Sequence, residues 1–372
     1  MAEIGIGIIG GGYMGKAHAV AMSAVGAVFD TPLRPRLEMV AASSEASAAR
    51  YADLFGFARS TGDWRVLVDD PRVEAIIIAS PPETHLAITK AAAAAGKPVF
   101  CEKPLGASFE EATAMTNVAE AAGIVNMIGF NYVRTPATQF ARHLIAEGAI
   151  GDITWFRGEH TEDFYADPDA PATWRAAGDA NGCMGDLAPH MINACLALAG
   201  PISSVMAEIE TVHKTRGGDP VTNDDQGQIM CRFESGAMGH LFFSRTATGR
   251  KMGYIYEVTG TKGAIRFNQE DQNSLWLYKC EGPEAQRGFT QILIGPEHPD
   301  YEPFCLGPGH GTGYQDQIII EARDFLRAIA AGKPLWPKFR DGLEVSRIVE
   351  VARQSHTTRS WADVTPETGN GM

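Results

Sequence analysis

Lys103, Asp186 and His190 are the residues of this chain best suited to acid–base chemistry. Asp186 and His190 are four residues apart at an expected helix start, so they lie on one helical face, in contact. An aspartate beside a histidine selects the ring tautomer and raises the basicity of the imidazole, which is typical of a proton acceptor. Lys103 follows a short apolar run, so its amine is expected at the carboxyl end of a strand. Taken singly, Lys103 could be a solvated loop lysine and His190 a core histidine, and both alternatives stay open.

A glycine cluster lies between an apolar run at residues 4–9 and an expected helix. It matches GxGxxG: Gly10 permits a tight turn, Gly12 lets the backbone approach a pyrophosphate, and Gly15 permits close packing of helix on strand. The helix start also offers free N–H groups and the positive end of the helix dipole. We therefore predict that Gly10, Gly12, Tyr13, Met14 and Gly15 bind a dinucleotide; a plain glycine turn is the alternative.

The end of the second expected strand is where a dinucleotide-binding fold usually carries an acidic residue for the ribose 2′-hydroxyl. Here the strand ends in Ser43 and Ser44, and Glu45 lies too far into the next helix. A serine can bond either a hydroxyl or a 2′-phosphate, but the nearest arginine is Arg50. The pattern favours NAD, with NADP as the alternative.

The ends of the third and fourth strands should line the same cleft, because ligands of open α/β sheets lie outside the carboxyl ends of the strands. The third strand is followed by Ser80, Pro81 and His85, and the fourth by Glu102 and Lys103. We expect these five residues to contact the cofactor. A histidine that only packs on its loop is the alternative for His85.

The elements that must position these residues alternate between short strands and Ala-rich helices over the first 130 residues. Strands are expected at 4–9, 37–42, 73–79, 98–101 and 124–130, with a loop at 27–36 interrupting the rhythm. Helices at 45–55, 86–95 and from Ser108 to near Gly123 fill the intervals. This βαβ order predicts a doubly wound parallel sheet, a Rossmann domain over residues 1–133.

The pattern changes in the remainder, where many strand-like runs are separated by turn signals and only a few helices are interleaved. We expect residues 134–372 to form an α+β domain on a large, mostly antiparallel open sheet, with C-terminal helices that can pack back on the first domain. The helix at 314–331 carries Ile318, Phe325 and Ile329 on one face. The tail, 365–372, is expected to be frayed.

The composition argues against several classes of protein, including nucleic-acid-binding and membrane-binding proteins. The chain has 372 residues, 45% of them hydrophobic and 21% charged, with a net charge of −13. Such a chain can bury a core, and an acidic chain without a basic stripe argues against nucleic acid or an anionic membrane as partner. The six cysteines form no CxxC or zinc-type spacing, so we expect no metal and no disulfide framework. With no signal-type N-terminus or long apolar run, we predict a cytoplasmic protein with reduced thiols.

Four motifs in this order resemble the Gfo/Idh/MocA oxidoreductases. They are the N-terminal GxGxxG, the Ser-Pro-Pro-x-x-His turn at 80–85, Glu-Lys-Pro at 102–104, and the Asp-x-x-x-His motif at 186–190. The resemblance implies a Rossmann domain, a C-terminal α/β domain whose open sheet mediates dimers or tetramers, and NAD(P)-linked oxidation of a sugar or cyclic polyol. It also implies that Lys103, Asp186 and His190 are catalytic. Ala188 and Asn193 depart from the glycine and aspartate that are frequent in the family.

Oxidation of a ring hydroxyl explains why such residues are needed. The hydroxyl proton needs an acceptor with a pKa near the working pH, while the hydride passes to nicotinamide. We predict His190 as base, Asp186 as its orienter, and Lys103 as anchor and proton relay; Lys103 as the base is the alternative. Predicted substrate contacts are Lys103, Tyr132, Arg134, Trp174, Arg175, Asp186 and His190, with weaker candidates at Asn131, His160, Asp163 and Tyr165.

Two further functions stay open. Relatives that retain NAD and cleave glycosides without net turnover use the same scaffold, and a non-catalytic dinucleotide-sensing regulator could share the fold. The sequence leaves undecided which inositol or sugar is the substrate, which hydroxyl reacts, the oligomer size, and any role for His310 in its Gly-rich loop.

Overall fold

The computed structural model describes residues 2–364, which form two compact units. The first comprises the chain up to Thr135 together with Gly295–Ser346, and the second comprises Pro136–Ile294 and the chain from Arg347. The sequence predicted one boundary after residue 133, with C-terminal helices that can pack back on the first domain. In the structure, residues 295–346 belong to the first unit, because the apolar face of a helix at 314–331 joins its core. The tail that was expected to be frayed lies outside the described residues.

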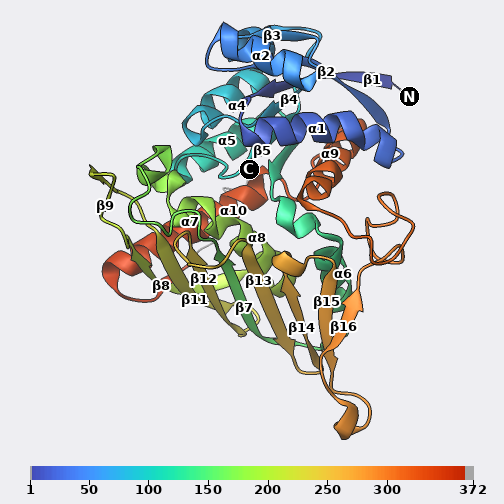
Figure 1. Cartoon of the computed structure of the whole chain (residues 1–372), viewed down its shortest axis with the longest axis vertical. Helices are drawn as coiled ribbons and strands as arrows, with labels where there is room; N and C mark the ends of the chain where they lie inside the picture. The colour runs from blue at the N-terminus through green and yellow to red at the C-terminus, as the bar shows by residue number, and fades with distance from the viewer. Residues whose placement is uncertain (1, 365–372) are drawn as a thin grey trace. The chain divides into compact units, whose positions relative to one another are not determined.

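The first unit contains a six-stranded parallel sheet in the order β3-β2-β1-β4-β5-β6 (Figure 1). The strands are β1 (Ala2–Ile9), β2 (Leu33–Ala41), β3 (Arg59–Thr61), β4 (Ala75–Ile78), β5 (Val99–Glu102) and β6 (Asn126–Gly129). This order reverses direction between β1 and β4, so the carboxyl ends of these two strands flank the switch point at which doubly wound sheets bind dinucleotides. The predicted Rossmann domain is confirmed.

Two helices of the first unit have ends that capping residues in the sequence mark. The helices of this unit are α1 (Tyr13–Val28), α2 (Glu45–Phe55), α3 (Trp64–Asp69), α4 (His85–Ala94), α5 (Phe109–Ala121) and α9 (Tyr314–Ala331). Helix α2 ends at Gly56, whose φ of 81° is the left-handed conformation that glycine adopts without strain. Helix α5 begins at Ser108, whose side chain accepts a hydrogen bond from the Glu111 amide.

Two parts of the first unit differ from the sequence prediction. The loop expected at 27–36 is partly regular, since α1 continues to Val28 and β2 begins at Leu33. Pro35 is tolerated in β2 because β3 pairs only with Met39–Ala41, so β2 has a neighbour on one side alone at the proline. The short elements β3 and α3, over residues 59–69, were not predicted.

The second unit is built on a nine-stranded sheet in the order β16-β15-β14-β13-β7-β12-β11-β8-β17. Its strands are β7 (Ile153–Thr161), β8 (Ile202–Glu210), β11 (Gln226–Phe233), β12 (Met238–Ser244), β13 (Gly253–Gly260), β14 (Gly263–Asn268), β15 (Ser274–Lys279), β16 (Thr290–Leu293) and β17 (Ala362–Asp363). Only β7 and β12 pair in parallel; the other neighbours in this sheet are antiparallel. The predicted α+β architecture on a large, mostly antiparallel sheet is therefore confirmed.

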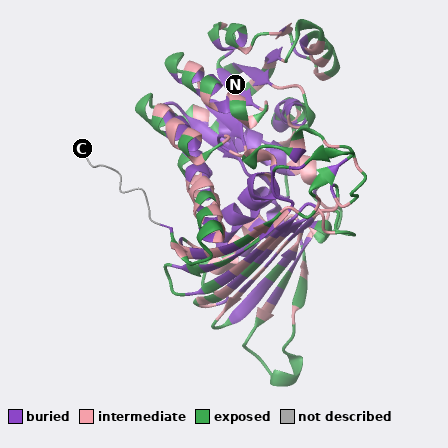
Figure 2. Ribbon diagram, turned by 90° about the vertical axis from the view of Figure 1, so that its left-hand side faces the viewer, coloured by how far each residue is buried: buried purple, intermediate pink, exposed green. Residues whose placement is uncertain are grey.

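Buried and exposed residues alternate along β11 of this sheet, and Figure 2 is coloured by this burial. One face is covered by α8 (Ala188–Ala199), and the Met191 sulfur lies so close to Gly158 of β7 that a side chain there would collide with it. The other helices of this unit are α6 (Pro136–Ala146), α7 (Cys183–Asp186) and part of α10 (Phe339–Thr358), with a small hairpin of β9 (Thr215–Arg216) and β10 (Asp219–Pro220).

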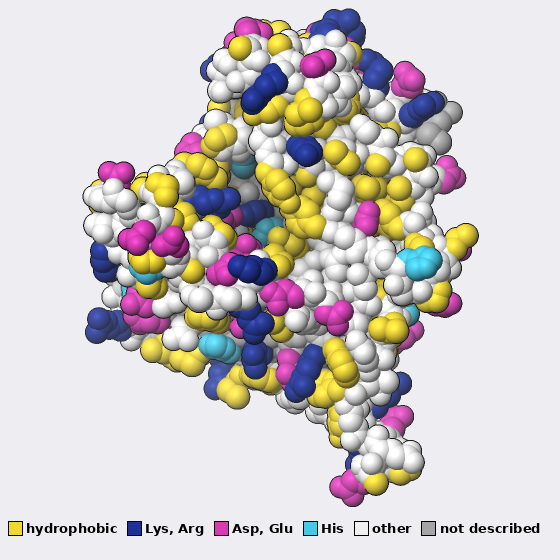
Figure 3. Space-filling model, in the orientation of Figure 1, with side chains coloured by type: hydrophobic (Ala, Val, Ile, Leu, Met, Phe, Trp, Pro, Cys, Tyr) yellow, Lys and Arg dark blue, Asp and Glu magenta, His cyan; other side chains and the backbone are white. Residues whose placement is uncertain are grey.

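No helix within residues 2–364 combines the length and apolar character needed to cross a membrane. On the face drawn in Figure 3, lysine and arginine side chains are interspersed with aspartate and glutamate.

Candidate active site

The glycine loop of the first unit has the geometry that its sequence predicts. Gly10 has a φ of 109°, and a Cβ atom there would lie 2.3 Å from the Ala79 carbonyl oxygen. A Cβ atom at Gly15 would lie 1.9 Å from the Gly10 carbonyl oxygen, so α1 can pack on the loop only without a side chain. Gly12 caps α1 without a side-chain hydrogen bond, and a Cβ atom there would meet no atom within 4 Å. The open space beside this helix start fits the approach of a pyrophosphate.

Tyr13 and Met14 lie between these glycines on the first turn of α1. The Tyr13 side chain is 71% exposed, and its ring stacks on Tyr314 with 6.0 Å between the ring centres. The Tyr314 hydroxyl donates a hydrogen bond to the Met14 sulfur. The loop is therefore braced by α9, a contact partner that the sequence did not reveal.

The serines at the end of β2 have different environments. Ser44 is the N-cap of α2, and its oxygen accepts a hydrogen bond from the Ser47 amide at 3.2 Å. Ser43 is exposed. The carboxylate of Glu45 accepts a bond from the Gly62 amide, so it faces β3. Both serines are exposed, and their predicted binding to ribose stays a prediction.

His85 ties two predicted cofactor loops together. Its buried ring contacts the Ser80 carbonyl through Nε2 at 2.9 Å and the Pro104 carbonyl through Nδ1 at 3.1 Å. Burial lowers the pKa of His85, although the carbonyl contacts oppose the shift. The Ser80 hydroxyl is paired with Thr84, and Pro81 leads into a single 3₁₀ turn. These contacts support a structural role for His85, the alternative that the sequence left open.

Glu102 is the last residue of β5 and is buried against α1. Its carboxylate lies 2.6 Å from Nε2 of His18, a histidine that is also buried. His18 could not be predicted from the sequence, because nothing in the spacing of α1 distinguishes it from a core position. Near this pair, burial and the Glu102 charge raise the pKa of Glu321 well above its usual range. Lys103 follows Glu102 directly, at the carboxyl end of the sheet.

Tyr132 and Arg134 were predicted to contact substrate, and both are buried in the first unit. The Tyr132 ring lies against Tyr314, with 6.0 Å between ring centres. The Arg134 guanidinium lies 2.7 Å from the Asp324 carboxylate and donates to the Trp336 carbonyl at 2.8 Å. Through these contacts, Arg134 links the chain just after β6 to the segment 295–346. The side chain of the weaker candidate Asn131 similarly donates to Gln317.

In the second unit, Arg175, Asp186 and Trp174 come together. The Asp186 carboxylate, at the end of α7, accepts a hydrogen bond from the Arg175 guanidinium at 2.5 Å. The same guanidinium lies over the rings of Trp174 and Phe164, at 4.4 and 5.2 Å from the ring centres. Trp174 is 64% exposed, so one face of this stack is open to solvent.

His190 lies in the first turn of α8 and is buried. Its ring centre lies 5.6 Å from that of His160, whose Nδ1 contacts the Leu187 carbonyl and whose Nε2 contacts Glu162. The Tyr254 hydroxyl donates to the His190 carbonyl at 3.4 Å. His190 is thus enclosed by side chains of β7 and β13. The predicted action of Asp186 on His190, and their joint action with Lys103 of the first unit, stay predictions.

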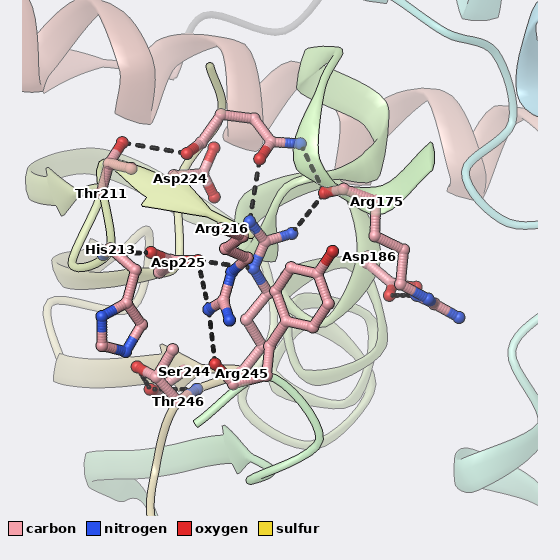
Figure 4. Close-up of polar contacts among 12 residues, drawn as sticks. Arg175, Asp186, Thr211, His213, Arg216, Asp224, Asp225, Ser244, Arg245 and Thr246 are labelled. Atoms are coloured by element: carbon pink, nitrogen blue, oxygen red, sulfur yellow. Dashed lines mark hydrogen bonds and ion pairs between the residues drawn. The ribbon is translucent and has the colours of Figure 1, made fainter. Parts of the chain in front are cut away.

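Arg216, Asp225 and Arg245 form a buried cluster that contacts Arg175 through Arg245 and that no sequence motif marks (Figure 4). Its members lie at the ends of β9, β11 and β12, where no motif marks them. Among residues 2–364, no group of three or more His, Cys, Asp or Glu side chains is arranged to hold a metal ion.

Comparison with known proteins decides the family. Residues 4–130 match the model of an oxidoreductase family with an NAD-binding Rossmann fold, and residues 138–266 match that of the GFO/IDH/MocA C-terminal domain. The chain is 39% identical to levoglucosan dehydrogenase of Pseudarthrobacter phenanthrenivorans, over 98% of this chain and 99% of that protein. The chain belongs to the GFO/IDH/MocA oxidoreductase family.

Other relatives agree with this GFO/IDH/MocA assignment. A solved structure of levoglucosan dehydrogenase in complex with NADH and levoglucosan superposes with a TM-score of 0.96, at 40% identity, covering 98% of this chain and 100% of the other. Inositol 2-dehydrogenase of Rhizobium meliloti is 27% identical over 94% of this chain and 96% of its own. The family resemblance and the NAD-binding Rossmann domain that the sequence predicted are confirmed.

Proposed function

We propose that this protein is an NAD-dependent dehydrogenase that oxidises a ring hydroxyl of an uncharged sugar, with levoglucosan as the first substrate to test. The full-length similarity to levoglucosan dehydrogenase is the observation that carries the proposal. The substrate is a small molecule that combines a ring with several hydroxyl groups. The exposed Trp174 ring suits the apolar face of such a ring, and the carboxylate and guanidinium beside it suit hydroxyl groups.

Each proposed catalytic residue has a distinct task. His190 accepts the hydroxyl proton, Asp186 orients the histidine, and Lys103 anchors the same oxygen and relays the proton. Bound NAD supplies the acceptor for the hydride. The Arg175 bond to Asp186 supports this assignment, because it fixes the position of the carboxylate.

NAD is the proposed cofactor rather than NADP. Ser43 is exposed near the start of α2, and a hydroxyl there suits a ribose hydroxyl. Arg50 lies over the ring of Tyr51, 4.9 Å from its centre, which occupies the nearest guanidinium in the sequence. Titration of the protein with NAD and with NADP tests this directly. Tighter binding of NADP would overturn it.

A homo-oligomer formed through the nine-stranded sheet is proposed as well. The register places Met230 opposite His240, Met238 opposite Trp155, and Trp276 opposite Arg266, all on the face away from α8. Met230, Met238 and Trp276 are exposed apolar side chains. A sheet face with exposed apolar side chains is suited to pack against another such face, and a second copy of this chain provides it. Light scattering on the wild type and on Met230→Glu distinguishes an oligomer from a monomer.

The activity is tested by NADH formation with levoglucosan and with a panel of aldoses and inositols. Lys103→Met and His190→Asn should each lower kcat by roughly 10²- to 10⁴-fold, the range for loss of a positioned proton-transfer group. Unchanged turnover in both variants would contradict the assignment of these residues. If none of the sugars or polyols reduces NAD or NADP, the proposed function fails.

A further inference from the structure

Two buried arginines, Arg216 and Arg245, share one carboxylate in the second unit. Nε of Arg245 donates to the Asp225 carboxylate at 2.9 Å, and Arg216 lies 3.8 Å from the same oxygen. The side chains of all three are 0–1% exposed. Both guanidinium groups also lie over the Tyr165 ring, at 3.8 Å for Arg216 and 4.8 Å for Arg245. Hydrogen bonds to their terminal nitrogens offset the cost of burying two cations, while Nε of Arg216 has no hydrogen-bond partner among the described residues.

The terminal nitrogens of Arg245 hold the chain segment that carries Arg175, one directly and the other through Asn223. One terminal nitrogen donates to the Arg175 carbonyl at 2.7 Å and to the Asn181 carbonyl at 3.0 Å. The other donates to the side-chain oxygen of Asn223 at 2.8 Å. The Asn223 amide in turn donates to the carbonyls of Arg175 and Gly178, at 3.0 and 2.9 Å. The Arg175 carbonyl therefore accepts from two buried side chains.

The Arg175 side chain extends these contacts to the proposed catalytic aspartate. While its carbonyl is held by Arg245 and Asn223, its guanidinium donates to the Asp186 carboxylate. Figure 4 shows the Arg175 carbonyl bonded to Arg245 and the Arg175 guanidinium bonded to Asp186. Two successive hydrogen bonds therefore connect the buried Arg245 to Asp186. The first is from Arg245 to the Arg175 carbonyl, and the second is from the Arg175 guanidinium to the carboxylate.

We propose that Arg245 and Asn223 are positioning residues for catalysis, which act by fixing the backbone of Arg175 so that its guanidinium holds Asp186 in place. The inference rests on the proposed function, because it treats Asp186 as part of the catalytic group. Positioning of this kind matters for rate, since a displacement of about 1 Å at a reacting group can cost on the order of 10²-fold.

Arg216 is a matched control within the same cluster. It is as buried as Arg245, faces the same carboxylate and lies over the same ring, but its terminal nitrogens donate to the carbonyls of Asp167 and Tyr165. Neither of these bonds reaches Arg175. Replacing Arg216 should therefore disturb the cluster without releasing Arg175.

The experiment compares Arg245→Lys with Arg216→Lys, using NAD and levoglucosan. A lysine keeps the charge but cannot make all of the bonds of a guanidinium. Arg245→Lys should lower kcat roughly 10- to 100-fold, with the KM for sugar changed less than kcat, whereas Arg216→Lys should change kcat less than about 2-fold. Equal losses of kcat in both variants, in proportion to their loss of thermal stability, would overturn the proposal.

A double-mutant cycle tests whether Arg245 acts through Arg175. Arg175→Gln removes the bond to Asp186 at a partly exposed position, so this variant should fold. In the Arg175→Gln background, Arg245→Lys should lower kcat by less than about 2-fold, because the step it controls is already lost. A full additive loss would show that Arg245 acts by another route.

If Arg245→Lys does not fold, Asn223→Ala replaces it. This variant removes both Asn223 bonds to the loop and leaves the arginine–Asp225 contacts in place, so it should lower kcat in the same direction. Unchanged kcat in Asn223→Ala would overturn the proposal.

Hydrogen exchange separates failure of this inference from failure of the proposed function. Amides of residues 174–182 should exchange faster in Arg245→Lys, and those of 165–170 faster in Arg216→Lys, whatever reaction the protein catalyses. An inactive wild type with this exchange pattern would refute the dehydrogenase assignment alone. An active wild type without the pattern would refute the positioning proposal alone.

Discussion

The glycine loop of the first unit and the segment 163–186 of the second are both predicted binding regions, yet they are held in different ways. The loop is fixed by backbone: its φ angles and close contacts leave no room for side chains at Gly10 and Gly15. The segment is fixed by buried side chains that reach it from other strands, chiefly Arg216 and Arg245. The first region is therefore sensitive to mutation within its own motif, and the second to mutation far away in sequence.

The largest expected effect tests the side-chain half of this comparison. Asp225→Asn removes the carboxylate shared by two buried arginines and should destabilise the second unit by about 3–5 kcal/mol, as loss of one partner in a buried ion pair does. Urea unfolding followed by circular dichroism measures it. Asp163→Asn is the control, because Asp163 pairs with the exposed Lys251 and its loss should change the midpoint little. Equal midpoints for both variants would show that the cluster does not stabilise the unit.

Alanine substitutions in the glycine loop test the backbone half. Gly15→Ala places a Cβ atom against the Gly10 carbonyl and should cost about 1–3 kcal/mol in the free energy of unfolding, as overpacking does. Gly12→Ala meets open space, so its stability should match the wild type while its affinity for NAD falls. Thermal unfolding without cofactor and a fluorescence titration with NAD separate the two effects. If Gly12→Ala destabilised the protein as much as Gly15→Ala, the distinction between packing and binding glycines would fail.

A smaller effect is expected where the first unit does use a side chain. Ser44→Ala removes the N-cap of α2 and should cost about 1 kcal/mol. Ser43→Ala, at the exposed neighbouring position, should leave the unfolding midpoint unchanged and weaken only NAD binding. A midpoint that falls equally in both variants would argue against the cap.

The smallest predicted effect is a pH dependence. Because burial lowers the pKa of His85 in the folded protein, the unfolded chain binds a proton below about pH 6.5 that the folded chain does not. Stability should therefore fall as the pH falls through the ordinary pKa of histidine, about 6.5, because protonation then favours the unfolded chain. The urea midpoint of the wild type, compared with that of His85→Gln at a pH on each side of this pKa, isolates this contribution. An equal change with pH in both proteins would rule it out.

The sequence predicts those parts of the molecule that depend on local rules. The parallel strands, the stop at Gly56, the cap at Ser108 and the glycine loop each follow from a few adjacent residues. Strand β3 has only three residues and carries no periodicity, so it was missed. The apolar face of the helix at 314–331 allowed for its packing on the first domain, but local spacing could not give the bounds of the returning segment, 295–346.

In the candidate site, too, local motifs could be predicted and long-range contacts could not. The motif that contains Asp186 and His190 could be recognised from its spacing. The partner of Asp186 could not, since Arg175 is eleven residues away in a short 3₁₀ helix. Arg134, which was predicted to bind substrate, pairs with Asp324, almost 200 positions later in the chain. Arg245 lies 70 residues from the carbonyl that it holds. Contacts of this range depend on the whole fold.

The return of residues 295–346 to the first unit has a consequence for how this protein can be made. The core beneath α1 includes Ile318, Phe325 and Leu326 of α9, which the ribosome adds only after residues 136–294 of the second unit have been synthesised. A gene fragment that ends after the sixth parallel strand would leave that apolar surface exposed to water. The nucleotide-binding half therefore cannot be obtained by simple truncation; a fragment for separate study would need residues 2–135 joined by a short linker to 295–346.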